Sequence, residues 1–107
     1  MVVYSVAIAI QSHIEPDWVE WMKQVHIPGV IKTGCFSECL MCKVLESVGE
    51  EANYLIQYYC DSIENYNRYR SDFAPALQKE HSDKFMGCFR GSRQLLHEVF
   101  RVAKLLK

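Results

Sequence analysis

Bulky and small side chains alternate at the start of the chain, between residues 2 and 10. A period of two residues places the bulky side chains on one face of an extended strand and the small ones on the other. The pattern therefore predicts a first β-strand over Val2–Ile10. Its bulky face comprises Val2, Tyr4, Val6, Ile8 and Ile10, and its small face comprises Val3, Ser5, Ala7 and Ala9.

A helical pattern follows this strand. Ser12 is a candidate cap, and Pro16 suits a first helical turn because no amide hydrogen is needed there. We expect Pro28 and Gly29 to end the helix after His26. Apolar residues recur at helical spacing and form one stripe, which comprises Trp18, Trp21, Met22 and Val25.

Two further strands are predicted in the middle of the chain, over Phe36–Val48 and Tyr54–Cys60. The second of these, YLIQYYC, is rich in aromatic and β-branched residues, which favour a strand. The loop VGEEAN separates the two strands. They are therefore expected to form a hairpin.

A long second helix is predicted from Ser62 to Phe85, because apolar and aromatic positions recur there every three or four residues. Pro75 must kink this helix or divide it in two. The inward stripe comprises Tyr66, Tyr69, Phe73, Leu77, His81 and Phe85.

The last part of the chain is ambiguous. Gln94–Phe100 alternates as a strand does, whereas residues 101–107 fit either a helical turn or a frayed end. We predict a fourth strand over Gln94–Phe100 and a C-terminal tail over residues 101–107.

The predicted order β-α-β-β-α-β is the ferredoxin-like arrangement, an α+β fold with a four-stranded antiparallel sheet and two helices on one face. We expect a single domain over residues 1–100. Two helices cover only one face of the sheet, yet the third strand carries Leu55 and Tyr59 on the face opposite Ile56. This open face is too apolar for water, so we expect a homodimer in which two sheets pack together.

Composition narrows the choice of partners. The 107 residues suffice for one ordinary domain, and 50% of them are hydrophobic. With 12 basic and 13 acidic residues the net charge is −1, which favours neither nucleic acid nor an anionic membrane as a partner. The longest apolar stretch, VVYSVAIAI, is shorter than the roughly 20 residues of a membrane-spanning helix and lacks the charged start of a secretion signal. Five cysteines, an odd number without such a signal, fit reduced thiols in the cytoplasm.

Several short motifs occur in a specific order, and together they identify a family. They are WVEWM at Trp18–Met22, HIP at His26–Pro28, QYYC at Gln57–Cys60, YNRY at Tyr66–Tyr69 and FAPALQKEH at Phe73–His81. From about residue 2 to about residue 98 the chain resembles a bacterial family of short ferredoxin-like domains of unknown function, family 4286. Such proteins are similar to the dimeric α+β barrel superfamily, whose subunits pair through their sheets. The resemblance implies the fold and the dimer described above.

The same resemblance implies no particular activity. The dimeric α+β barrel superfamily includes cofactor-independent monooxygenases, haem-degrading monooxygenases, muconolactone-isomerase-like enzymes and non-catalytic members. A shared fold is compatible with many functions, so function has to be argued from the residues of the site. The resemblance brings no established catalytic residue to this chain.

The stretch CFSECLMC places Cys35, Cys39 and Cys42 in the C-x3-C-x2-C spacing of the cluster ligands in radical S-adenosylmethionine enzymes. On a strand, Cys35 and Cys39 point to one face and Cys42 to the other, and the first two lie roughly 13 Å apart. A zinc site needs four ligands, and no second C-x2-C or H-x3-H pair is present. We therefore expect no metal and no cofactor, with the thiols packed as small apolar side chains.

His26 and His81 are the candidate catalytic residues. His26 follows Met22 by four residues, and His81 lies on the apolar stripe of the second helix, so both are expected to reach the space between helices and sheet. An imidazole there suits a general base or a ligand contact, because its pKa lies near neutrality. The alternative is that His26 caps the end of a helix and that His81 is a packing residue.

Aromatic residues are the candidates for ligand binding between helices and sheet. They are expected either to line a pocket for a flat organic compound or to belong to the core. Arginines at positions 68, 70, 90 and 93 suit a carboxylate or phosphate, but surface charge is the simpler interpretation. The ligand-binding candidates are Trp18, Trp21, Tyr58, Tyr69 and Phe73.

Three hypotheses for function remain open. The first is a homodimeric domain that binds a small organic ligand between its helices and its sheet. The second is a cofactor-independent monooxygenase or isomerase that acts on a small aromatic or dicarbonyl compound with His26 or His81 as base. The third is a structural or interaction domain whose interior is filled by side chains.

Overall fold

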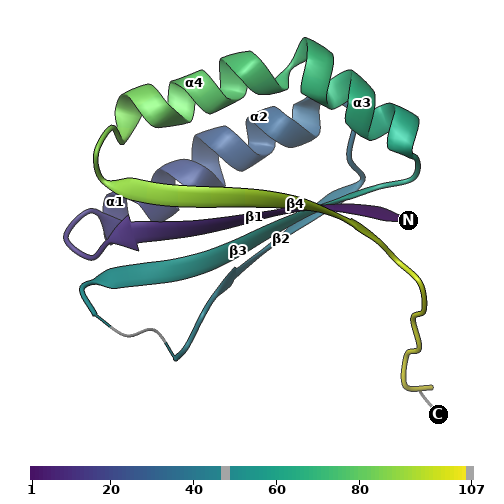
Figure 1. Cartoon of the computed structure of the whole chain (residues 1–107), viewed down its shortest axis with the longest axis horizontal. Helices are drawn as coiled ribbons and strands as arrows, with labels where there is room; N and C mark the ends of the chain where they lie inside the picture. The colour runs from purple at the N-terminus through teal and green to yellow at the C-terminus, as the bar shows by residue number, and fades with distance from the viewer. Residues whose placement is uncertain (47–48, 106–107) are drawn as a thin grey trace.

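The computed structural model describes residues 1–46 and 49–105. The order of its elements matches the predicted β-α-β-β-α-β, except that each predicted helix is divided into shorter pieces (Figure 1). The elements are β1 (Val2–Gln11), α1 (Glu15–Trp21), the π-helical η1 (Met22–His26), α2 (Ile27–Lys32), β2 (Glu38–Lys43), β3 (Glu51–Cys60), α3 (Ile63–Asp72), α4 (Ala74–Lys84) and β4 (Phe89–His97).

The four strands form one antiparallel sheet in the order β2-β3-β1-β4. β1 pairs with β3 along its whole length and with β4 from Val2 to Ile10. All helices lie on one side of this sheet (Figure 1). The predicted ferredoxin-like α+β fold is therefore confirmed.

The core lies between the sheet and the helices. The bulky face of β1 and the paired positions of β3 supply one half of it, and the inward stripes of the helices supply the other. Apolar burial of this kind is the main favourable term in folding. The side chains that are less than 2% exposed are Ile10, Trp18, Val30, Cys35, Ile56 and Cys60.

The first helical segment continues past Pro28, which corrects the prediction that it ends after His26. The backbone forms a π turn over η1, in which the amide of Ile27 donates to the carbonyl oxygen of Met22, five residues back. Pro28 consequently falls in the first turn of α2, where its missing amide hydrogen costs nothing. The proline that was expected to stop the helix instead begins its next piece.

The π turn also changes which side chains face the sheet. Trp18 and Met22 are buried as predicted, but Val25 is 45% exposed and does not belong to the inward stripe. One extra residue in the turn displaces Val25 outward. Ser12 does not cap the helix either, since its hydroxyl donates to the carbonyl oxygen of Glu50.

Several strand boundaries differ from the prediction. β2 is shorter than Phe36–Val48, and residues 47 and 48 lie outside the described part of the chain. β3 begins three residues before Tyr54, so part of the expected loop is strand. β4 spans Phe89–His97 rather than Gln94–Phe100, because it pairs with β1 over nearly the whole length of β1. Because β4 is an exposed edge strand, its residues do not alternate between apolar and polar, and its bounds could not be predicted from that pattern.

Pro75 divides the second helix in two, as predicted. The first piece ends before Phe73 and the second starts after it, with Pro75 in its first turn. Ser62 caps the first piece, because its hydroxyl oxygen accepts a hydrogen bond of 3.2 Å from the amide of Asn65. The predicted inward stripe faces the sheet, with Tyr69, His81 and Phe85 buried and the other positions partly buried.

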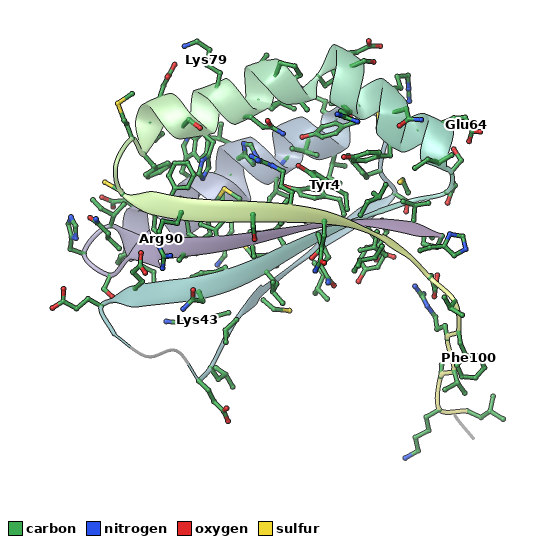
Figure 2. All side chains as sticks on the ribbon, viewed as in Figure 1. Tyr4, Lys43, Glu64, Lys79, Arg90 and Phe100 are labelled. Carbon is green, nitrogen blue, oxygen red and sulfur yellow. The ribbon has the colours of Figure 1, made fainter. Side chains whose placement is uncertain are left out.

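The outer face of the sheet, opposite the helices, carries apolar side chains, three of which are exposed. We define it by Val3, Ala7, Leu40, Leu55 and Leu96, which alternate with the helix-facing positions of their strands. Leu40, Leu55 and Leu96 are 50%, 39% and 37% exposed. After β4, residues 98–105 form neither helix nor strand and extend away from the helices (Figures 1 and 2). Within residues 1–46 and 49–105, no helix has the length and apolar character needed to cross a membrane.

Candidate functional site

A small cavity lies between the helices and the sheet. Its volume is about 40 Å³, which is room for roughly two or three water molecules. Figure 2 shows Tyr4, one of its wall residues, in the layer between β1 and the helices. The wall is formed by Tyr4, Val6, Ile8, Ile56, Tyr58, Phe89 and Arg93 from the sheet, and by Met22, His26, Tyr69, Gln78 and His81 from the helices.

The π turn places His26 in the cavity wall. His26 is the last residue of η1, and its ring stacks on Trp21 with centroids 5.4 Å apart. The Nδ1 atom of His26 is buried and has no hydrogen-bond partner within residues 1–46 and 49–105. Such a buried polar atom without a partner costs free energy, and π turns are frequent at functional sites. Because the helix continues past His26, this residue does not cap a helix end.

His81 lies beside His26 and is held by a tryptophan. The Nε1–H group of Trp18 donates a hydrogen bond of 2.9 Å to Nε2 of His81. Since Nε2 accepts this bond, the proton of the neutral imidazole resides on Nδ1. The rings of His26 and His81 are 5.6 Å apart between centroids, and the ring of Phe89 is 4.5 Å from that of His81. The structure thus brings the two candidate histidines together.

Both imidazoles are neutral at pH 7. Burial lowers the pKa of His26 to about 4, with a smaller effect from the positive charge of Arg93. Burial also lowers the pKa of His81 to about 4, assisted by His26 and by Arg93. Desolvation disfavours the charged form of a buried base, and nearby positive charge acts in the same direction. The cavity therefore contains two hydrogen-bonding groups without charge.

Arg93 supplies the positive charge of the site. It lies on β4 opposite Val6 of β1, on the helix-facing side of the sheet. Burial raises the pKa of Tyr4, and the positive charge of Arg93 partly offsets this rise, with smaller contributions from hydrogen bonds of Arg93 and Gln78 to the Tyr4 hydroxyl. Arg93 is an exposed residue, so it stands at the rim of the cavity rather than inside it.

The tyrosines of the wall remain neutral. Burial raises the pKa of Tyr58 and of Tyr69, and the neighbouring tyrosines add to this effect. Tyr58 also hydrogen-bonds with the thiol of Cys39, whose pKa burial raises to about 12. These groups therefore act as hydrogen-bond donors rather than as charges.

The five aromatic candidates have different positions. Tyr58 and Tyr69 line the cavity. Trp18 and Trp21 contact the two imidazoles without lining the cavity, and Phe73 is partly buried against the core. The structure therefore brings four of the five aromatic residues to the histidine pair or the cavity wall.

Sequence reasoning did not place Tyr4 and Gln78 in the site, and it weighed Arg93 as a contact for a carboxylate or phosphate but favoured surface charge. Tyr4 was assigned only to the bulky face of the first strand, and Arg93 was placed outside the fourth strand. Aligning the fourth strand with the whole of β1 would have set Arg93 opposite Val6, on the helix-facing side. Gln78 offered no comparable signal, because a polar residue three positions before His81 is ordinary on a helix.

The cysteines of the C-x3-C-x2-C pattern are separated. Cys39 pairs with Tyr58 on the helix-facing side, whereas Cys42 pairs with Leu55 on the outer face and is exposed. Cys35 does not lie on the strand, which corrects the expected position, but is buried in the turn before β2. Thiols on opposite faces of a sheet cannot share one cluster. Across residues 1–46 and 49–105 no three His, Cys, Asp or Glu side chains are grouped as a metal site.

Solved structures with similar folds include proteins of several kinds. A dimeric ferredoxin-like protein from an uncultured marine organism has a TM-score of 0.71 and 15% identity, covering 97% of this chain and 100% of that one. A mutant of SnoaB, a cofactor-independent oxygenase from Streptomyces nogalater, has a TM-score of 0.68 and 10% identity, covering 96% and 98%. A mutant of MhuD with two manganese protoporphyrin IX bound per active site has a TM-score of 0.67 and 18% identity, covering 97% and 100%. At such identities the likeness shows the fold alone.

Sequence comparison places the chain in a family. No curated protein matches it. A family model described as "Domain of unknown function (DUF4286)" matches residues 1–99, which include every described helix and strand. The resemblance inferred from the motifs is thereby confirmed, and the chain belongs to this family of ferredoxin-like domains of unknown function.

Proposed function

We propose that the chain is the subunit of a homodimer that binds a small, flat organic compound between its helices and its sheet. The observation that carries this proposal is the buried Nδ1 atom of His26, which has no partner within the described residues and belongs to a residue of the cavity wall. A ligand that brings a hydroxyl or carbonyl group to this atom would remove the cost of leaving it unpaired.

The size of the cavity limits what fits inside it. At about 40 Å³ it is far smaller than the roughly 300–1,000 Å³ of typical ligand pockets. The cavity therefore accepts only the polar tip of a ligand, while the remainder extends toward the rim at Arg93. Because Arg93 is exposed and its side chain is long, it can move aside at little cost.

Binding is favoured over catalysis by the state of the two imidazoles. A general base works best with a pKa near the working pH, whereas the pKa values of His26 and His81 are lowered to about 4. In addition, Nε2 of His81 already accepts the hydrogen bond from Trp18. A monooxygenase or isomerase would therefore have to rely on His26 as its base, and a ligand would first have to raise its pKa.

The proposed dimer forms through the outer face of the sheet. This face is apolar at Leu40, Leu55 and Leu96, and the helices leave it uncovered. A sheet with two apolar faces needs cover on both. One solved neighbour is itself described as a dimeric ferredoxin-like protein, which supports the same assembly here.

Tryptophan fluorescence tests the binding proposal directly. The chain has two tryptophans, and both contact the imidazole pair, Trp18 through its hydrogen bond to His81 and Trp21 through its stacking on His26. We expect at least one compound from a panel of benzoate, benzamide, phenol and 4-hydroxybenzoate to change the emission in a saturable way. A panel in which no compound does so contradicts the proposal.

A cavity-filling variant separates binding from folding. Val6→Leu adds one methylene group to the cavity wall, so it should retain the stability of the protein and abolish the fluorescence response. Val25→Leu makes the same change on the exposed helix surface and should leave the response intact. Equal responses from the two variants would mean that the compound binds elsewhere.

A further inference from the structure

An open cleft adjoins the cavity. It has a volume of about 300 Å³ and is lined by aromatic rings and two arginines. The cleft and the cavity share four wall residues, Tyr4, Tyr69, Gln78 and Arg93. The two spaces therefore adjoin at these side chains, and the cleft offers the volume that the cavity lacks.

Among the described residues, no carboxylate forms an ion pair with Arg93. The ion pairs formed within residues 1–46 and 49–105 join Lys43 to Glu15, Lys79 to Asp83, Arg90 to Glu51 and Arg101 to Glu98, and none of them includes Arg93. In the site, its guanidinium group contacts the neutral hydroxyl of Tyr4. A guanidinium group at the rim of a low-dielectric cavity attracts an anion more strongly than one in open water.

A second guanidinium group lies in the same cleft. Arg70, in the last turn of α3, lines it together with Arg93 and belongs to none of those ion pairs. The first turn of α4 forms the wall beside Arg70 through Ala74 and Pro75, and the start of a helix carries partial positive charge. The net charge of the chain is −1, so this positive field is local to the cleft.

The remaining wall of the cleft is aromatic. Tyr4, Tyr66 and Tyr69 lie close together, with the ring centroids of Tyr4 and Tyr66 5.4 Å apart and those of Tyr4 and Tyr69 5.9 Å apart. Aromatic faces suit a flat apolar body. None of the residues that line the cleft is a glycine, so the cleft lacks the flexible backbone cradle that commonly holds phosphate groups.

From these observations we infer that the ligand is a small aromatic carboxylic acid. Its carboxylate binds Arg93 and Arg70 in the cleft, its ring lies against the tyrosines, and its far end enters the cavity. This inference rests on the proposed function, because it names the class of ligand for that same site. Guanidinium groups bind carboxylates through paired, charge-assisted hydrogen bonds. The acid should therefore bind more tightly than a neutral analogue.

Benzoate and benzamide form a matched pair of probes, because they share one shape and differ in charge. We expect benzoate to bind the wild-type protein at least about tenfold more tightly than benzamide, as measured by tryptophan fluorescence and calorimetry. Added salt should lower the affinity for benzoate and leave the affinity for benzamide unchanged. Arg93→Gln should remove most of the difference in affinity between benzoate and benzamide, and Arg70→Gln should remove part of it.

Two arginines serve as controls for the loss of charge. Arg90 lies on β4 as well, but it pairs with Glu51 away from the cleft, and Arg68 lies two residues before Arg70 on α3. Arg90→Gln and Arg68→Gln should both retain tight binding of benzoate. Equal affinities for benzoate and benzamide, or equal losses in Arg93→Gln and Arg90→Gln, would overturn the inference while the proposed cavity stands. If no compound of the panel binds, the proposed function fails and this inference fails with it.

Discussion

Nε1 of Trp18 donates to Nε2 of His81 across 63 positions of sequence, over a distance of 2.9 Å, and so joins the first helix to the last. Trp18 is completely buried and His81 is 7% exposed, so water does not compete for this bond. The bond holds the ring of His81 in one tautomer and beside His26. The geometry of the candidate site therefore depends on a residue that does not line the cavity.

Replacing this tryptophan should change the acid–base behaviour of the histidine. Trp18→Phe removes the donor that stabilises the neutral form of His81, so the pKa of His81 should rise from about 4. The unpaired nitrogen and the lost volume should together cost roughly 2–4 kcal/mol of stability. Titration of the imidazole C–H signals by NMR gives the pKa, and chemical denaturation gives the stability.

Trp21→Phe is the control for that experiment. Trp21 packs near His81, with ring centroids 5.8 Å apart, and stacks on His26. Its replacement should leave the pKa of His81 close to the wild-type value, because the hydrogen bond from Trp18 remains. If both variants moved the pKa of His81 equally, burial alone and not this bond would govern its protonation.

Acid should destabilise the protein in a defined range of pH. The unfolded chain protonates its histidines near pH 6.5, whereas the folded chain keeps His26 and His81 neutral down to about pH 4. Between these values the unfolded state binds more protons, so stability falls as the pH falls. Each imidazole should contribute about 1.4 kcal/mol per pH unit in this range.

The slope of stability against pH tests that contribution. His26→Gln removes one of the two buried imidazoles and should roughly halve the fall between pH 6.5 and pH 4. His13→Gln removes an exposed imidazole and should preserve the fall. Hydrogen bonds from Lys43 and Tyr54 lower the pKa of Glu15, so its contribution to stability is lost only below about pH 4.5, at the acid end of this range. A flat profile in the wild type would show that the two histidines are solvated and not buried.

Most of the fold was predictable because its determinants are local. The alternation at the start of the chain gave β1, and Pro75 marked the division between α3 and α4. The continuation of the helix past Pro28 was not predictable, because the spacing of apolar residues does not indicate the π turn that accommodates this proline. The position of β4 was also missed, since it is set by pairing with β1 and not by its own polar residues.

The residues of the candidate site were predictable where the helix or strand that carries them was predicted correctly. His26 and His81 lie at helical spacing from buried residues, so both were expected near the cavity. The residue type of Arg93 indicates an anion contact, but its place at the cavity follows only once β4 is paired with β1. The bond between Trp18 and His81 depends on how two helices pack, for which a single sequence gives no signal.

Two glycines, one within the first helical segment and one just after it, should respond oppositely to alanine. Gly29 lies within α2, and a methyl group there would meet Leu77 at 3.6 Å, an ordinary packing distance. Gly29→Ala should therefore stabilise the protein by about 0.5–1 kcal/mol. Gly34 has a φ of +79°, so Gly34→Ala should destabilise it by about 1 kcal/mol. Thermal denaturation of the two variants decides both signs, and a destabilised Gly29→Ala would contradict the helical continuation past Pro28.

A charge on the outer face should dissociate the proposed dimer. Leu55→Arg places an arginine on β3 opposite the helices, where two copies of it would repel each other and remain unpaired. Val25→Arg adds the same charge at a similarly exposed position on the helix layer, 45% against 39%. Light scattering should give the mass of a dimer for the wild type and Val25→Arg, and of a monomer for Leu55→Arg. A monomeric wild type at micromolar concentration would contradict the dimer.

A crystal structure of the protein with 4-hydroxybenzoate tests the central claim most directly. We predict its carboxylate in the cleft at Arg93 and its hydroxyl group in the cavity, within about 3.2 Å of Nδ1 of His26. Contact between that nitrogen and the ligand would explain why this buried polar atom has no partner within residues 1–46 and 49–105. A cavity that holds only water, with the compound bound elsewhere, would contradict the account.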